Sequence, residues 1–167
     1  MPTVTEKLEG LDVWIYHGQI YIPNTYSAGA VGSRFLIELR DKKRIMGIRC
    51  PICDWVYVPP RATCKVCFNK LEEWVEVSDK GTLLTYAIVR QPSPVQPVEP
   101  PFAYGIVHLE GADSGFVHLL GEVEFDRLRI GMRVQAVFKE ERAGSILDIK
   151  YFRPMGRRRR ATRTVAA

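Results

Sequence analysis

Four cysteines are the residues of this chain whose type and spacing are best suited to chemistry. They form two Cys-x-x-Cys pairs, Cys50 with Cys53 and Cys64 with Cys67, and ten residues separate the pairs. Each Cys-x-x-Cys turn directs two thiolates at one point, so two turns together supply the tetrahedral ligand set of a Zn²⁺ ion. Because four thiolates leave no coordination position open, we predict a structural zinc ion that does not activate water.

Two other uses of clustered cysteines are an iron–sulfur centre and a redox pair of the thioredoxin kind. A redox pair would not need the second Cys-x-x-Cys motif. Disulfides are disfavoured because residues 1–10 are polar and lack the apolar core of a signal peptide. The sequence also lacks an apolar run near the roughly 18 residues of a membrane span, so we expect a cytoplasmic protein.

The residue that follows each cysteine pair matters because zinc ribbons usually carry glycine there, at a positive φ. In this sequence the two positions hold Asp54 and Phe68. Aspartate tolerates the left-handed conformation, whereas phenylalanine adopts it poorly because its Cβ crowds the backbone. The second turn is therefore expected to be distorted.

The motifs that would make this chain an enzyme on its own are missing from the sequence. It holds no G-x-S-x-G elbow, no P-loop and no G-x-G-x-x-G motif, and metal ligation leaves no thiol as a nucleophile. His17 falls in a predicted turn, while His108 and His118 fall on neighbouring predicted strands, where they can face each other. Strand histidines without an acidic neighbour are more often packing residues. We therefore predict no catalytic residue, and a binding or scaffolding protein.

The segment before the cysteines combines a hairpin and a helix. Residues 13–23 are rich in aromatic and β-branched side chains on both sides of His17, which predicts a hairpin with its turn there. Ser27 is a candidate N-cap for a helix over residues 28–40. Two glycines weaken that helix, and they leave a strand over residues 35–39 as the alternative.

The segments after the cysteines are strand-like, with β-branched and aromatic residues that partly alternate and with glycines between them. Strands are expected at 45–49, which leads into the cysteines, and at 74–77, 82–90, 104–110, 116–124, 133–140 and 145–152. One short helical segment is expected at 125–129. Short strands at this spacing favour a closed antiparallel barrel of the oligonucleotide/oligosaccharide-binding (OB) type, which leaves no sheet edge exposed.

The predicted fold is mainly β, with four parts along the chain. They are an N-terminal extension with hairpin and helix (1–44), a four-cysteine zinc ribbon (45–72), an OB-type barrel (73–154) and a basic disordered tail (155–167). The net charge of +5 arises near the C-terminus, because residues 153–167 contain six arginines and no acid. The rest of the chain holds 18 basic and 19 acidic residues. The tail is expected to serve solubility or loose contact with an acidic partner.

A proline-rich loop and the residues beside it form a second candidate site. Residues 91–101 hold five prolines, which make the segment stiff and unable to join a sheet. Such a loop suits a rigid crossover or a partner surface. Tyr86, Arg90, Phe102 and Tyr104 lie on or beside it and are candidates to stack nucleic-acid bases, or to hold the adenine and phosphates of coenzyme A. Core packing is the third explanation for them.

Together, these parts resemble the zinc-ribbon/OB-fold family of proteins associated with acyl-CoA metabolism, over roughly residues 26–154. The motifs that carry the resemblance are the cysteine quartet, RIMGIR (44–49), VYVPPR (56–61), WVEVS (74–78) with Gly81-Thr82, PFAY (101–104), LRIGM (128–132) and FRP (152–154). Each motif is common by itself, and their combination is what resembles the family.

The resemblance implies a small non-catalytic subunit that accompanies a thiolase or a related condensing enzyme in a hetero-oligomer. It implies that the barrel contributes to the acyl-CoA channel and that the ribbon holds the larger, thiolase-like subunit. The chain also resembles the small subunit of the benzoylsuccinyl-CoA thiolase of anaerobic toluene degradation. The alternative is a nucleic-acid-binding ribbon-and-barrel protein that uses Arg157–Arg160. A zinc-dependent hydrolase is disfavoured by the closed ligand set.

Overall fold

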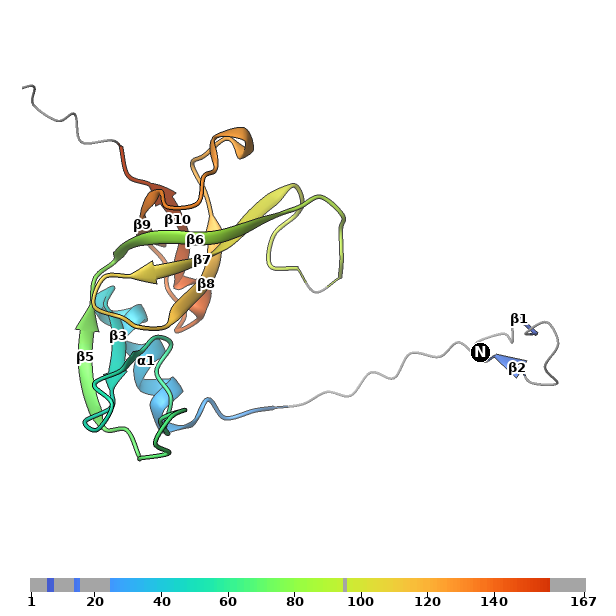
Figure 1. The fold of residues 1–167 in the computed structure, drawn as a ribbon. Coiled ribbons are helices and arrows are strands. Elements are labelled where there is room, and N and C mark those ends of the chain that lie inside the picture. The colour runs from blue at the N-terminus through green and yellow to red at the C-terminus, as the bar shows by residue number, and fades with distance from the viewer. Residues whose placement is uncertain (1–5, 8–13, 16–24, 95, 157–167) are drawn as a thin grey trace, which may run out of the picture.

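The computed structural model describes the chain over four ranges, which are residues 6–7, 14–15, 25–94 and 96–156. Figure 1 shows how these parts are arranged. Near the N-terminus, β1 (Glu6–Lys7) and β2 (Trp14–Ile15) pair antiparallel. Most of the predicted hairpin, including His17, lies outside the described residues, as does the arginine-rich part of the tail. None of the helices within the described ranges is long and apolar enough to cross a membrane.

The helix α1 (Gly29–Lys42) confirms the helical prediction for this region, and the alternative strand is wrong. Its N-cap is Ala28, one residue after the predicted Ser27, and no side chain caps the helix in the usual way. The Ser27 hydroxyl still accepts a hydrogen bond from the first amide of the helix at 3.1 Å, which satisfies one donor of the first turn. Phe35 and Leu39 lie four residues apart on the buried face.

The cysteine pairs are carried by a three-stranded antiparallel sheet in the order β4-β3-β5. The central strand β3 (Ile45–Arg49) confirms the predicted strand and ends one residue before Cys50. β4 (Val56–Tyr57) lies in the arm between the two pairs, and β5 (Glu73–Val77) follows the second pair. Because β3 is central and α1 packs against it, its first four residues are buried.

Five strands close into a barrel in the order β10-β8-β7-β6-β9, which confirms the OB-type prediction. They are β6 (Lys80–Val89), β7 (Phe102–Leu109), β8 (Gly115–Leu120), β9 (Arg133–Phe138) and β10 (Ile149–Pro154). One seam departs from the antiparallel pattern, because β10 runs parallel to β8 where Phe152 pairs with Leu120. The reason is geometric: strand directions cannot alternate all the way around a closed ring of five.

Three barrel strands are shorter than the sequence predicts: β9 ends at Phe138 and not at residue 140, and at β8 and β10 the chain turns out of the sheet. β8 is predicted to reach residue 124 but ends at Leu120, and Glu122 takes a positive φ of 53°, which no extended strand contains. β10 is predicted from residue 145, but η2 (Ile146–Asp148) precedes it as a single 3₁₀ turn held by a capping box. The other 3₁₀ turn, η1 (Phe125–Arg127), confirms the predicted helical segment.

One hydrophobic core joins the barrel to α1 and β3. Along β7, buried Val107 and Leu109 alternate with outward-facing residues such as Tyr104 and His108, as expected for a strand with one face in the core. The buried face of α1 packs into the same cluster, and Figure 1 shows the helix beside β3, below the barrel. Ribbon and barrel are therefore held together by shared packing.

Asp148 holds the loop before β10, and its replacement by asparagine is expected to destabilise the fold by about 2 kcal/mol at pH 7. Its carboxylate accepts hydrogen bonds from the amides of Ala143 (3.0 Å), Gly144 (2.8 Å) and Ser145 (3.1 Å). An asparagine oxygen cannot serve all three donors. Urea unfolding measures the loss, and the exposed Asp126→Asn is the control, with little expected change.

The pKa of Asp148 gives this prediction a pH dependence. Burial raises the pKa, but the three amide hydrogen bonds outweigh burial, so the pKa in the folded chain lies below its ordinary value. The stabilisation is therefore complete above the unfolded pKa of about 3.9 and is lost as the pH falls through the lower folded pKa. The difference between the wild type and Asp148→Asn should shrink in that acid range. A difference that does not depend on pH would contradict the carboxylate's role.

Candidate metal centre and the groove beside the proline loop

The first cysteine turn begins directly after the central strand of the ribbon sheet. The Cys50 amide donates to the Trp55 carbonyl and the Asp54 amide donates to the Cys50 carbonyl, both at 2.9 Å. Asp54 takes a positive φ of 53°, as predicted for the residue after the pair. The Cys53 amide donates to Cys50 Sγ at 3.4 Å, a hydrogen bond that stabilises negative charge on the sulfur.

The second turn repeats the first. The Cys64 amide donates to the Asn69 carbonyl at 2.9 Å, and the Val66 amide donates to Cys64 Sγ at 3.4 Å. Phe68 takes the positive φ, at 58°, so the expectation of a distorted turn is wrong. The Phe68 side chain is 77% exposed and meets no packing constraint. The only free-energy cost in this turn is that of the left-handed backbone conformation at Phe68, about 1–2 kcal/mol.

The four Sγ atoms form one cluster, in which all lie within 4.8 Å of one another. Cys50 Sγ is 3.5 Å from Cys67 Sγ, and Cys53 Sγ is 3.9 Å from Cys64 Sγ, so both contacts join the two turns. Four sulfurs placed about 2.3 Å from a central ion lie about 3.8 Å apart, which agrees with these separations. The contacts are too long for disulfide bonds of about 2.05 Å. The donor set thus fits a tetrahedral thiolate-bound ion such as Zn²⁺.

Hydrogen bonds and crowding shift the pKa values of the thiols in opposite directions. The hydrogen bond from the Tyr57 hydroxyl lowers the pKa of Cys64 to about 6. The hydrogen bond with Cys67, followed by burial and the other two thiols, raises the pKa of Cys53 to about 12. Four thiols this close cannot all carry a negative charge unless a cation lies among them. A zinc ion removes that penalty because it bonds each thiolate directly.

The arm between the cysteine pairs is fixed to the barrel at the turn between β7 and β8. The Val56 amide donates to the Asp113 carboxylate at 2.8 Å, and the Asp113 amide donates to the Val56 carbonyl at 2.9 Å. The Ser114 hydroxyl accepts from the Val58 amide at 2.6 Å and donates to the Val58 carbonyl at 2.8 Å. These partners could not be predicted from the sequence, because more than fifty positions separate them from the arm.

The four residues predicted to contact coenzyme A lie on two different faces. Phe102 and Tyr104 are two residues apart in β7 and point to the same face, where both line a groove. Tyr86 points to the other face, where its hydroxyl donates to the Leu128 carbonyl at 3.2 Å and its ring packs against the core. Arg90 follows the end of β6 and is exposed. The fold therefore brings two of the four together.

The groove lies between the proline loop and the outer face of the β7–β8 pair, and its volume is about 470 Å³. Apolar and aromatic side chains form most of its wall, among them Pro97, Phe102, Tyr104, Val117 and Leu147. Within the loop, the Gln96 side chain accepts from the Ser93 amide at 3.0 Å and donates to the Gln91 carbonyl at 2.9 Å. These two hydrogen bonds add to the stiffness that the prolines provide.

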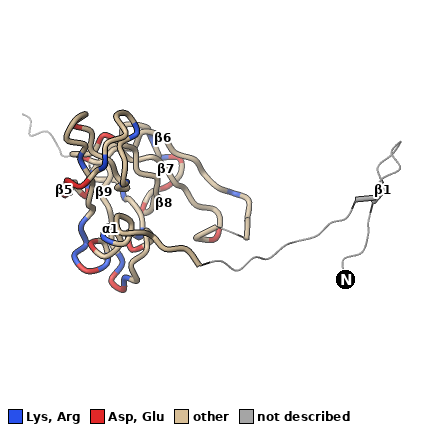
Figure 2. Tube along the Cα trace, turned by 90° about the horizontal axis from the view of Figure 1, so that it is seen from below, with Lys and Arg blue, Asp and Glu red and all other residues tan. Residues whose placement is uncertain are grey.

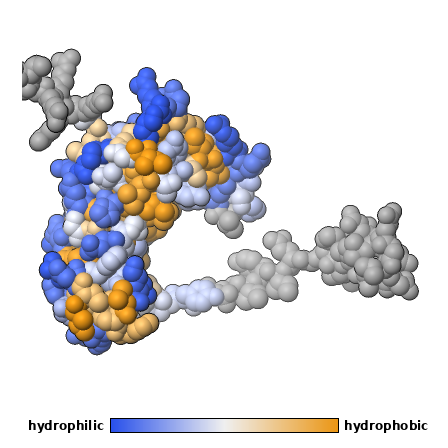
Figure 3. Space-filling model, in the orientation of Figure 1, coloured by the Kyte–Doolittle hydropathy of each residue, from blue (hydrophilic) through white to orange (hydrophobic). Residues whose placement is uncertain are grey.

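The tips of the two cysteine turns form a second apolar surface, the knuckle patch. Its residues are Ile52, Val66 and Phe68, of which Ile52 and Val66 occupy equivalent positions in the two turns. All three side chains are more than half exposed. Figure 3 shows hydrophobic side chains gathered at the lower end of the molecule, where the cysteine turns lie. Exposed apolar side chains that gather in this way favour contact with another protein.

The two strand histidines, which the sequence allowed to face each other, do not do so: His108 pairs with Gly115 and His118 pairs with Gly105. His118 points into the barrel, where it is buried beside the rings of Phe116 and Phe152, which also contact each other. Its Nδ1 accepts from the Leu119 amide at 2.9 Å, which leaves Nε2 to donate to the Ile146 carbonyl at 3.1 Å. Burial lowers the pKa of His118. His108 points outward from β7, and His118 serves packing.

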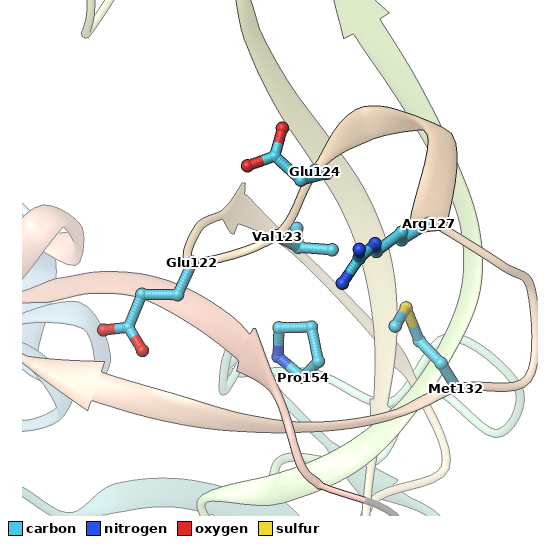
Figure 4. Close-up of a pocket in the computed structure, with 6 residues that line it drawn as sticks. All are labelled: Glu122, Val123, Glu124, Arg127, Met132 and Pro154. Atoms are coloured by element: carbon cyan, nitrogen blue, oxygen red, sulfur yellow. The ribbon is translucent and has the colours of Figure 1, made fainter.

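A pocket of about 840 Å³ near the end of β8 brings acidic residues close to an arginine (Figure 4). The carboxylates of Glu122 and Glu124 point away from its centre, whereas Arg127 points inward, toward Met132 and Pro154. Glu122 is also engaged by the hydroxyl of Tyr151 and by Arg153. The two carboxylates therefore form no acid/base pair in this pocket.

A four-cysteine zinc ribbon followed by a closed OB-type barrel defines the class of this protein. Two family models match it: the ChsH2 rubredoxin-like zinc ribbon domain over residues 38–72 and the ChsH2 C-terminal OB-fold domain over residues 74–139. A DUF35 domain-containing scaffold protein from Pyrococcus furiosus is 30% identical over 127 residues, which cover 74% of this chain and 92% of the relative. The chain therefore belongs to the DUF35 scaffold protein family.

Further relatives agree with this assignment. A DUF35 domain-containing scaffold protein from Methanocaldococcus jannaschii is 29% identical over 123 residues, covering 71% of this chain and 86% of the relative. The solved structure of an Ltp2-ChsH2 (DUF35) aldolase matches with a TM-score of 0.57 and 25% identity, covering 73% of this chain and 93% of that one. A Sulfolobus solfataricus DUF35 protein of unknown function shares the fold, with a TM-score of 0.58, 19% identity and coverage of 76% and 87%.

Proposed function

We propose that the chain is a non-catalytic, zinc-binding accessory subunit of a thiolase-type acyl-CoA enzyme. The observation that carries the proposal is the convergence of the four thiols on one site, because metal ligation removes every cysteine that acyl transfer would use as a nucleophile. Cys50, Cys53, Cys64 and Cys67 would hold the zinc ion as a structural fastener with no open position for a substrate. The relative named together with an Ltp2 aldolase supports a catalytic partner for this chain as well.

We assign the acyl-CoA contact to the groove, at the boundary with the catalytic subunit. Phe102 and Tyr104 present aromatic surface to it, which suits an adenine ring or an apolar acyl group. Arg90, at the start of the proline loop, supplies a positive charge for the phosphates. Tyr86 is committed to the Leu128 carbonyl and is the weakest of the four candidates. Figure 2 shows few charged residues along the described part of the loop, whereas both signs are mixed over the rest of the body.

We assign the contact with the catalytic subunit itself to the knuckle patch. Ile52, Val66 and Phe68 stand at the end of a rigid ribbon, so they lose little conformational freedom when they are covered. A few well-packed side chains near the centre of an interface supply most of its binding energy. The ribbon would hold the large subunit while the barrel reaches the acyl-CoA site.

The test of this proposal is purification of the tagged chain from its native cells. A thiolase-type subunit is expected to co-purify, and acyl-CoA turnover is expected from the complex but not from the isolated zinc-loaded chain. The reason is that a Claisen-type exchange needs a nucleophilic thiolate and a base placed together. Turnover by the isolated chain would make it an enzyme. Co-elution of nucleic acid in place of a protein would favour the nucleic-acid-binding alternative.

In the same complex, Tyr104→Ala is expected to raise the KM for the acyl-CoA substrate about tenfold, which corresponds to the loss of about 1.4 kcal/mol of contact energy. The kcat should change little, because the reacting groups belong to the partner. Ile130→Ala is the matched control, since Ile130 is 68% exposed and lies outside the groove. An unchanged KM in Tyr104→Ala would remove the groove from the acyl-CoA site but leave the subunit assignment intact.

A further inference from the structure

The hydroxyl of Tyr57 lies at the second cysteine turn although Tyr57 belongs to β4. Its oxygen is 3.2 Å from Cys64 Sγ and 3.3 Å from the amide nitrogen of Lys65. Tyr57 and Cys64 are both buried, at 4% and 1% exposure. Water therefore cannot take the place of either partner, and the hydroxyl has only these two groups to bond.

The direction of these two hydrogen bonds follows from which of the groups can donate a proton. An amide N–H can only donate, so Lys65 takes a lone pair of the Tyr57 oxygen. The single hydrogen of the hydroxyl is then free to point at Cys64 Sγ, which would accept it as a thiolate. The hydrogen bond is thus charge-assisted and lies in a dry environment, where it is strongest.

Tyr57 is itself held in place from three sides. In the sheet it pairs with Ile48 of β3, two residues before Cys50 of the first turn. Its neighbours Val56 and Val58 are fixed to the barrel by Asp113 and Ser114, as described above. The hydroxyl therefore reaches the second turn from a rigid support that also carries the first turn.

We infer that Tyr57 is a positioning residue for the zinc ion. It holds Cys64 Sγ in the orientation that meets the other three sulfurs, and it stabilises the thiolate in that position. The inference rests on the proposed zinc site and adds to it a residue that is not itself a ligand. Partners that bond to metal ligands in this way typically change metal affinity by about 10–100-fold when they are removed.

Tyr57→Phe tests this role because it removes the hydroxyl and keeps the ring, with its packing and its contact with the Arg61 guanidinium. Transfer of zinc from the full chain to a coloured chelator at pH 7 is expected to be about tenfold faster in Tyr57→Phe, at the same one zinc per chain. Tyr86→Phe is the matched control, since it removes a phenol hydroxyl bonded to a backbone carbonyl in the barrel. Zinc release from Tyr86→Phe should equal that of the wild type.

A spectroscopic measurement separates this role from simple packing. In the cobalt-substituted chain, the thiolate-to-cobalt charge-transfer band should move to lower energy in Tyr57→Phe, because a hydrogen bond withdraws electron density from the sulfur. Equal release rates and an unmoved band would overturn the role of Tyr57 and leave the zinc site standing. A folded wild type that binds no zinc would overturn both.

A measurement on the wild type covers the case in which Tyr57→Phe fails to fold. In the cadmium-substituted chain, the Tyr57 hydroxyl proton is expected to exchange slowly with water and to show a scalar coupling to ¹¹³Cd through Cys64 Sγ. Lack of that coupling in the folded, cadmium-loaded chain would contradict the hydrogen bond to the metal ligand.

Discussion

Replacing Cys64 with serine is expected to abolish zinc binding and to unfold the ribbon sheet. Cys64 is buried, and a serine hydroxyl there would be a poor zinc ligand. For so small a ribbon the metal-binding energy, on the order of 10 kcal/mol, is folding energy. Elemental analysis should fall from one zinc per chain to almost none. Near-UV circular dichroism should show the loss of ordered aromatic rings around the site.

The control for this variant changes the same turn without touching a ligand. Val66→Ser replaces a 57% exposed side chain between the same two cysteines and should retain zinc and stability. Wild-type protein stripped by a chelator should resemble Cys64→Ser, because both lack the ion. Iron in place of zinc, or a fully ordered ribbon without any metal, would contradict the assignment of a structural zinc site.

Replacing Gly105 with alanine is expected to destabilise the barrel by about 3 kcal/mol. Gly105 is in β7, where it pairs with Tyr86 of β6, next to a bulge at which the strand register shifts between Leu83 and Thr85. A Cβ at Gly105 would lie 2.6 Å from the Thr85 carbonyl oxygen and 2.6 Å from Leu83 Cδ1. A backbone oxygen cannot rotate away as a side chain does, so the two strands would have to separate.

Urea unfolding at neutral pH measures this loss, and Gly156→Ala is its control. A Cβ at Gly156 would meet no atom within 4 Å, so no packing penalty is expected there. The zinc content of Gly105→Ala should stay at one per chain, since the site lies in the other part of the fold. A stability equal to that of the wild type would show that the bulge is able to relax.

The sequence alone was enough to predict the four-cysteine cluster, because a cluster of this kind is built from two local turns. Each turn is specified within six consecutive residues, and the positive φ at Asp54 follows from the same local rule. The barrel strands were also predictable, since alternation and glycine breaks are local patterns. The distorted turn that was expected at Phe68 did not appear, because the free-energy cost of its backbone conformation is small when the ring is exposed.

The tertiary structure decided which distant residues meet. It closed the five-stranded ring with a parallel seam, and it separated Phe102 and Tyr104 from Tyr86 by placing them on opposite faces. It also turned His108 outward and His118 inward, because strand faces depend on register with neighbouring strands.

The role of Tyr57 shows the same division most clearly. The sequence places an aromatic residue between two cysteine pairs, but only the pairing of β4 with β3 aims its hydroxyl at Cys64 Sγ. The clustering of the four thiols was therefore determined by the sequence by itself, because each Cys-x-x-Cys turn is formed by residues close together in the chain. Their support was decided by the tertiary structure, because hydrogen bonds from β4 and from the Asp113 turn depend on how separate strands pack.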